Sequence, residues 1–125
     1  MAKKEQTAQP ARRSVHDVAR EMIPVLINWA KEGQAHTYGE LAKAVGFNCN
    51  RISRHLELIG TWLIGLGEKK GKRIPPLTLT IVLQGTGLPN PSIFEQHPNL
   101  EILQNVLEEC AGYDWSWVLE EIQTF

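Results

Sequence analysis

Side chains that bind anions and flat polar ligands are concentrated in two short stretches of this sequence. Arginine and asparagine can each form two hydrogen bonds at once with the edge of a nucleic acid base, and lysine and arginine attract phosphate. Both stretches therefore have the chemistry of a DNA contact. The 50–55 group consists of Asn50, Arg51, Ser53, Arg54 and His55, and the 69–73 group of Lys69, Lys70, Lys72 and Arg73.

The charges of the chain are divided along its length. All 13 Lys and Arg residues lie between Lys3 and Arg73, where they outnumber the acids by six. Residues 74–125 hold seven acids and neither lysine nor arginine. A chain divided in this way has one part suited to an anionic partner and one part that such a partner repels.

The other ionisable residues form no recognisable catalytic or metal-binding pattern. The four histidines are scattered, and Cys49 and Cys110 lack the paired spacing of a zinc site. The run LGEKKGKR (66–73) lacks the first glycine and the hydroxyl of a phosphate loop, and it follows a helical pattern instead of a strand. We therefore predict no enzyme activity, no metal and no cofactor.

Two capped helical patterns precede the 50–55 group. Ser14 begins an amphipathic helix that ends near Gly33, and Pro24 predicts a kink inside it. Residues 37–40 form a capping box for a second helix of about two turns, which Gly46 ends. Each helix has an apolar side that requires a packing partner.

A third helix is expected to carry the 50–55 group, with Asn48 or Asn50 as its cap. Its predicted buried side is the series Ile52, Leu56, Ile59 and Leu63. Two helices joined by so few residues form a helix-turn-helix, in which the beginning of the second helix enters the major groove of DNA. We expect the 50–55 group to lie outside the buried series, on the DNA-reading side.

The residues after this helix predict a wing. Gly65–Arg73 is expected to form a basic turn that presents the 69–73 group to phosphates. Leu77–Gln84 alternates in the manner of a strand, but the return strand, GLPNPSIF (87–94), contains two prolines and can pair only briefly. The predicted fold class is α+β, mainly α: a winged helix-turn-helix-like domain with extra C-terminal helices.

The acidic C-terminal part predicts a helix around Leu100–Cys110 and a shorter helical segment capped by Asp114. Trp115 and Trp117 lie two residues apart, so they cannot face one side of a helix together. One interpretation packs one of them on the core and exposes the other beside acidic residues, where an aromatic side chain suits a protein interface. The other packs both of them against the first helix around Trp29.

Length and composition indicate one domain. Residues 1–13 are polar and basic, which predicts a flexible tail, and residues 14–125 are predicted to form a single winged-helix-like domain. The sequence has no signal-peptide pattern and no apolar run near the roughly 20 residues that a membrane span needs. We therefore expect a cytoplasmic protein that contacts no membrane.

The run HTYGELAKAVG (36–46) resembles the helix-turn-helix of the methylated-DNA cysteine methyltransferases and alkyltransferase-like proteins, which begins with a similar TYGELA segment. The transferases carry a reactive cysteine in a PCHR motif, which this chain lacks. Cys49 is not its equivalent, because it precedes the predicted DNA-reading helix. The resemblance implies the fold and argues against the transferase activity.

A longer resemblance, over residues 37–118, is to the winged-helix-like region that precedes HNH nuclease domains in bacterial restriction and defence proteins. The similar elements, in order, are TYGELAKAVG, RISRHLELIG, IPPLTLTIVLQGTGLPN and YDWSWV. The chain has no HNH-type cluster of histidines and metal ligands. The resemblance implies an accessory role beside a separately encoded nuclease or other effector.

Two functions remain as predictions. In the first, the 50–55 and 69–73 groups bind double-stranded DNA, and the protein is an accessory or regulatory factor of a bacterial defence or restriction-like system. In the second, the chain is an adaptor that binds an effector protein through Trp115 and Trp117 in its acidic part. The two functions can coexist, and the sequence leaves the oligomeric state open.

Overall fold

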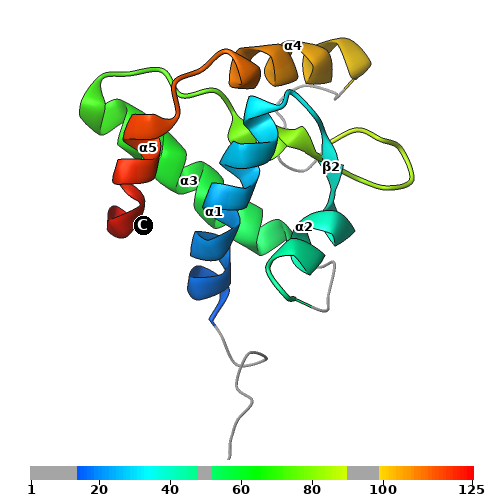
Figure 1. The fold of residues 1–125 in the computed structure, drawn as a ribbon, viewed down its shortest axis with the longest axis horizontal. Helices are drawn as coiled ribbons and strands as arrows, with labels where there is room; N and C mark the ends of the chain where they lie inside the picture. Colours follow the sequence, from blue (N-terminus) through cyan, green and yellow to red (C-terminus); the bar gives the residue numbers. More distant parts are fainter. Residues whose placement is uncertain (1–13, 48–51, 90–98) are drawn as a thin grey trace, which may run out of the picture.

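Helix α1 (Val15–Lys31) lies at the centre of the fold (Figure 1). The computed structural model describes residues 14–47, 52–89 and 99–125. The Ser14 hydroxyl accepts the backbone N–H of Asp17 at 3.0 Å, which confirms the predicted cap. The helix continues through Pro24, so the proline does not break it. Its buried side chains are Val18, Ala19, Met22, Ile23, Leu26, Ile27 and Ala30.

Helix α2 (Tyr38–Ala44) begins and ends as the sequence predicts. Thr37 and Glu40 exchange both hydrogen bonds of a capping box, at 3.1 and 2.8 Å. Gly46 follows the helix with a φ of 73°, a conformation that favours glycine. Local rules alone therefore account for this element.

Helix α3 (Ser53–Lys70) is longer than predicted and begins later. Its N-cap is Ile52, so the prediction of Asn48 or Asn50 as the cap is wrong; both asparagines lie outside the described residues. The predicted basic turn over Gly65–Arg73 is also wrong, because residues 65–70 belong to the helix. Leu66, which is buried, adds one more turn to the apolar series, and this packing outweighs the poor helix propensity of two glycines.

Residues 77–84 form a strand only in part. Leu77–Thr80 is a 3₁₀ helix, η2, and the strand β3 is limited to Ile81–Val82. η2 follows Pro75 and Pro76. The Pro75 carbonyl accepts the N–H of Leu77, and the Pro76 carbonyl accepts the N–H of Leu79. In η2 the buried residues are three apart, so the apolar alternation predicted a strand wrongly over these residues.

The small sheet has a topology that the sequence did not predict. Strand β3 pairs in parallel with β2 (His36–Thr37), which directly precedes α2. In the described ranges the sheet has these two strands and no antiparallel hairpin after α3. The α+β, mainly α fold class is confirmed, and the winged form of it stays a prediction.

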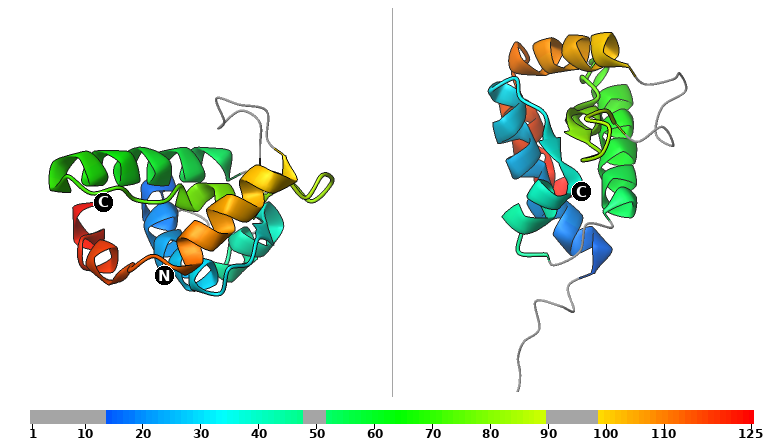
Figure 2. Two further views of the ribbon diagram at one scale, coloured as in Figure 1. Left: turned by 90° about the horizontal axis from the view of Figure 1, so that it is seen from above. Right: turned by 90° about the vertical axis from the view of Figure 1, so that its right-hand side faces the viewer.

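The C-terminal part agrees with its prediction of a helix followed by a shorter helical segment. Helix α4 (Leu100–Ala111), capped by Asn99, crosses one end of α1 (Figure 2). Helix α5 (Ser116–Glu120) and a final 3₁₀ turn, η4 (Ile122–Thr124), follow. The N-cap of α5 is Trp115 and not the predicted Asp114, although the Asp114 carboxylate accepts the N–H of Ser116 at 3.1 Å. None of the helices within the described ranges is long and apolar enough to cross a membrane.

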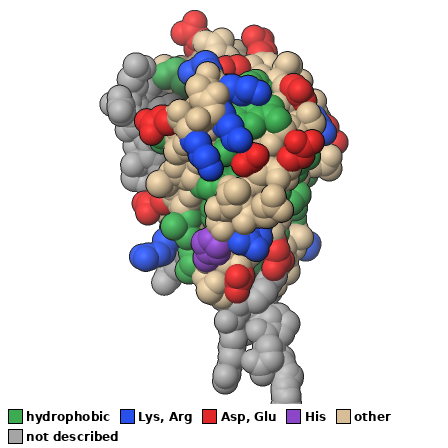
Figure 3. Space-filling view, turned by 90° about the vertical axis from the view of Figure 1, so that its left-hand side faces the viewer, with side chains coloured by type: hydrophobic (Ala, Val, Ile, Leu, Met, Phe, Trp, Pro, Cys, Tyr) green, Lys and Arg blue, Asp and Glu red, His purple; other side chains and the backbone are tan. Residues whose placement is uncertain are grey.

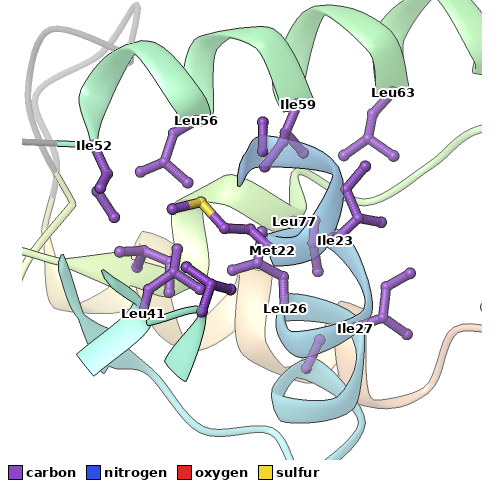
Figure 4. Close-up of a cluster of buried hydrophobic side chains, with 14 of the residues drawn as sticks. Met22, Ile23, Leu26, Ile27, Leu41, Ile52, Leu56, Ile59, Leu63 and Leu77 are labelled. Atoms are coloured by element: carbon purple, nitrogen blue, oxygen red, sulfur yellow. The ribbon is translucent and has the colours of Figure 1, made fainter. Parts of the chain in front are cut away.

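The core forms where α1 meets the predicted buried side of α3. Figure 4 shows Ile52, Leu56, Ile59 and Leu63 of α3 turned toward α1 and its neighbours. Helix α1 also packs against α2, α4 and η2. Because α1 packs against both α2 and α3, apolar packing holds these two helices relative to each other.

Candidate functional site

The beginning of α3 is the described part of the predicted DNA-reading surface. Arg54 is exposed and Ser53 is half-buried, while Asn50 and Arg51 lie outside the described residues. The first turn of α3 contains no acidic residue, and its cap makes no side-chain hydrogen bond. Helix N–H groups without such partners are suited to an anionic ligand.

His55 does not lie on this surface, and the prediction that it does is wrong. Only 4% of the residue is exposed, and its ring packs edge-on against Phe47 at a centroid distance of 5.3 Å. Burial lowers the pKa of its imidazole, which opposes a cationic contact with phosphate. Helical spacing gives the reason, because position 55 follows Ile52 by three residues and precedes Ile59 by four.

The beginnings of α1 and α3 lie at the same end of the molecule. His16 of α1 and Arg54 of α3 line one pocket of about 430 Å³, together with Trp62, Phe125 and the acidic Glu57. The His16 ring stacks on Phe125 at 4.4 Å between centroids. This end therefore combines a basic side chain with aromatic surface.

The 69–73 group lies at the other end of α3. The helix rises about 1.5 Å per residue, so Lys70 is roughly 24 Å from Arg54 along the axis. Arg73 forms two hydrogen bonds with the Glu109 carboxylate, at 2.7 and 2.9 Å, and these raise the pKa of Arg73. Lys70 pairs with Glu121 at 3.5 Å. Helices α3, α4 and α5 thus bring opposite charges together at this end.

Figure 3 shows a face on which several Lys and Arg side chains gather in one area, with carboxylates around them. The structure therefore does not join the 50–55 and 69–73 groups into one basic surface. It separates them along α3 and neutralises part of the second group. This separation follows from the helical conformation of residues 65–70, which were predicted to turn back.

The two C-terminal tryptophans have different environments. Trp115 is 1% exposed, and its indole N–H donates to the carbonyl of Cys110 at 2.8 Å. It is therefore not available as a partner contact, which corrects that prediction. Trp117 is half-buried; its N–H donates to the Tyr113 hydroxyl at 3.2 Å, and the Lys72 ammonium lies 4.6 Å from its ring centroid.

A groove lies between α3 and the segment that follows it, and it was not predicted from the sequence. The groove has a volume of about 790 Å³ and is bounded by α3 on one side and residues 71–79 on the other. Ile64, which is 67% exposed, lines it. The signal was Gly60, one turn before Ile64 in a helical pattern, because the absence of a side chain there leaves a depression beside Ile64.

Chemistry at a metal or nucleophile has no support in the described ranges. No group of three or more His, Cys, Asp or Glu side chains there could hold a metal ion. Burial raises the pKa of the Cys110 thiol to about 12, so it is not an activated nucleophile. Cys49 and His97 lie outside the described residues.

Comparison with known proteins identifies no relative. Neither the family models, nor the curated proteins, nor the solved structures contain a match to this chain.

Proposed function

We propose that the chain binds double-stranded DNA through the end of the molecule where α1 and α3 begin. The observation that carries this proposal is a difference in the ion pairing of basic side chains between the two ends of α3. At the far end, Lys70 and Arg73 are paired with acids, and Lys69 is exposed without an ion pair to another described residue. Arg54, at the beginning of α3, makes no ion pair with another described residue.

The order of the chain adds basic residues to the same end. Arg13 precedes Ser14, the cap of α1, and Arg51 precedes Ile52, the cap of α3. Lys3, Lys4 and Arg12 are further basic residues before Ser14 in the sequence. A helix beginning without acidic residues adds a favourable field for phosphate.

The packing of α2 and α3 on α1 agrees with this proposal. A helix that enters the major groove is held by the helices behind it, and its first turns contact the DNA. The buried series of α3 faces α1, so Arg54 faces away from the core. In this function the chain is an accessory or regulatory DNA-binding protein that acts with a separately encoded effector.

The test is fluorescence anisotropy with short duplex DNA over a range of salt concentrations. We expect salt-sensitive binding whose log-log slope falls by about 0.9 for each phosphate contact removed. Arg51→Ala with Arg54→Ala should weaken binding, whereas the matched pair Lys70→Ala with Arg73→Ala should have little effect. No binding at low salt, or equal losses in both pairs, contradicts the proposal.

A further inference from the structure

The groove beside α3 carries a second inference, which does not rest on DNA binding. Its floor and walls are largely apolar and include Leu63, Ile74 and Leu79. Ile64 is one of two large apolar side chains among the described residues that are mostly exposed; the other is Leu100, on α4. An exposed isoleucine beside a concave apolar surface is a feature of protein interfaces.

The basic and acidic side chains that line the groove differ in how they are paired, and this difference favours one kind of partner. Lys72 and Arg73 line it, but Lys72 lies over Trp117 and Arg73 is held by Glu109. Glu57 and Glu68 also line it, and neither pairs with a basic side chain within the described ranges. Contact with an aromatic ring leaves the charge of Lys72 in place, so two carboxylates and one ammonium of the groove have no ion-pair partner in the described ranges, an excess of one negative charge.

The two carboxylates have a fixed spacing. Glu57 and Glu68 are 11 residues apart on α3, which is three turns and about 16 Å. Residues so spaced lie on one side of the helix, and Gly60 and Ile64 occupy the turns between them. The surface thus presents an apolar centre with one negative charge toward each end.

We propose that the groove binds an amphipathic helix of a protein partner, whose apolar stripe has a lysine or arginine at each end, about three turns apart. Such a helix lies along α3 with its apolar side chains over Gly60 and Ile64 and its cations at Glu57 and Glu68. Apolar contacts at the centre provide affinity, and the flanking charges select the partner.

The probe is a pair of fluorescein-labelled helical peptides. Both carry the same leucine stripe at positions i, i+3, i+4 and i+7; one has lysines three turns apart at its ends, and the other has glutamates there. Anisotropy should give at least about tenfold tighter binding of the lysine peptide, a difference of about 1.4 kcal/mol. Equal binding of the two peptides overturns the proposal.

Substitutions then locate the peptide on the protein. Ile64→Glu should abolish binding, and Leu100→Glu, the matched change at the other exposed apolar residue, should leave it unchanged. Both residues are mostly exposed, so both variants should retain the far-UV circular dichroism of the native chain. If both variants lose peptide binding equally, the proposal is overturned, because the peptide then binds nonspecifically and not in the groove.

Reversing the two negative charges of the groove is the most specific test. Glu57→Lys with Glu68→Lys should reverse the preference, so that the glutamate peptide binds more tightly than the lysine peptide. Sedimentation velocity of the chain alone provides the remaining check. A dimer that Ile64→Glu dissociates would show that a second copy covers the groove, and would overturn the assignment of a basic partner helix.

Discussion

Arg73 and Glu109 form a two-point ion pair, with Nε 2.7 Å from Oε2 and Nη2 2.9 Å from Oε1. The pair joins the segment after α3 to α4, across 36 residues of sequence. A second contact, between Lys70 and Glu121, joins α3 to the residue that ends α5. Part of the charge division along the sequence is therefore neutralised within the molecule, where basic and acidic segments meet.

Removing the Arg73–Glu109 pair should cost little stability. Their side chains are 73% and 36% exposed, and exposed ion pairs contribute about 0.2–1 kcal/mol. We expect a coupling energy in that range from the double-mutant cycle of Arg73→Ala and Glu109→Gln, measured by urea unfolding. The coupling should decrease at high salt, and a value that salt leaves unchanged contradicts an electrostatic origin.

Cys110 should be unreactive in the folded protein. It is fully buried, and burial raises the pKa of its thiol from 9.0 to about 12. In a Cys49→Ser background, a thiol reagent at pH 8 should label Cys110 only after unfolding in urea. Rapid labelling of the native variant would contradict the burial of this residue.

The same pKa shift predicts a loss of stability at high pH. The thiol is favoured in the folded state, so its contribution is fully present below pH 9 and is lost between about pH 9 and 12. Cys110→Ala should remove this part of the pH dependence of the unfolding free energy. An unchanged pH profile in that variant would assign the alkaline transition to other groups.

Elements governed by local rules were predicted from the sequence. The caps at Ser14 and Thr37 and the stop at Gly46 each depend on a few neighbouring residues, and the structure has all three. The apolar series of α3 was also predicted correctly, because helical periodicity fixes which side chains share a face. These rules determine where the helices begin and end and which side of α3 is buried.

Features that depend on long-range packing were not predicted. The burial of Leu66 carries α3 through glycines that local propensity would place in a turn. The pairs of Arg73 with Glu109 and of Lys70 with Glu121 join segments far apart in sequence, so no local pattern indicates them. This packing divided the predicted basic site, and His55 was in addition assigned to the wrong side of α3.

His55 should make the protein less stable at mildly acidic pH. Burial lowers the pKa of its imidazole below 6.5, so the unfolded chain takes up a proton that the folded protein resists. Its contribution is present above pH 6.5 and is lost as the pH falls through the lowered value, at no more than about 1.4 kcal/mol per pH unit. Unfolding free energies from pH 7.5 to 5 measure the effect.

The matched variant for this measurement is His55→Gln, which keeps a polar side chain of similar length without a titrating group. Its unfolding free energy should vary less with pH over the same range. His16→Gln is the control, because His16 is exposed. If the two variants have the same pH profile, the acid sensitivity belongs to another group.

Gly67 and Gly65, both inside α3, should respond to alanine in opposite directions. A Cβ at Gly67 would lie 2.7 Å from the carbonyl oxygen of Lys72, whose N–H donates to the Gly67 carbonyl at 2.9 Å. A Cβ at Gly65 meets nothing within 4 Å. Gly65→Ala should therefore stabilise the protein by about 0.5–1 kcal/mol, because alanine is the better helix former.

Gly67→Ala forces the helix away from the turn that ends it and should destabilise the protein by more than about 1 kcal/mol. That turn has Gly71 at a φ of 64°, and the Lys72 hydrogen bond closes it, so the clash falls on backbone that cannot rotate away. Urea unfolding of the two alanine variants gives the comparison directly. Equal stabilisation by both would mean that residues 71–74 do not approach α3 as closely as the structure requires.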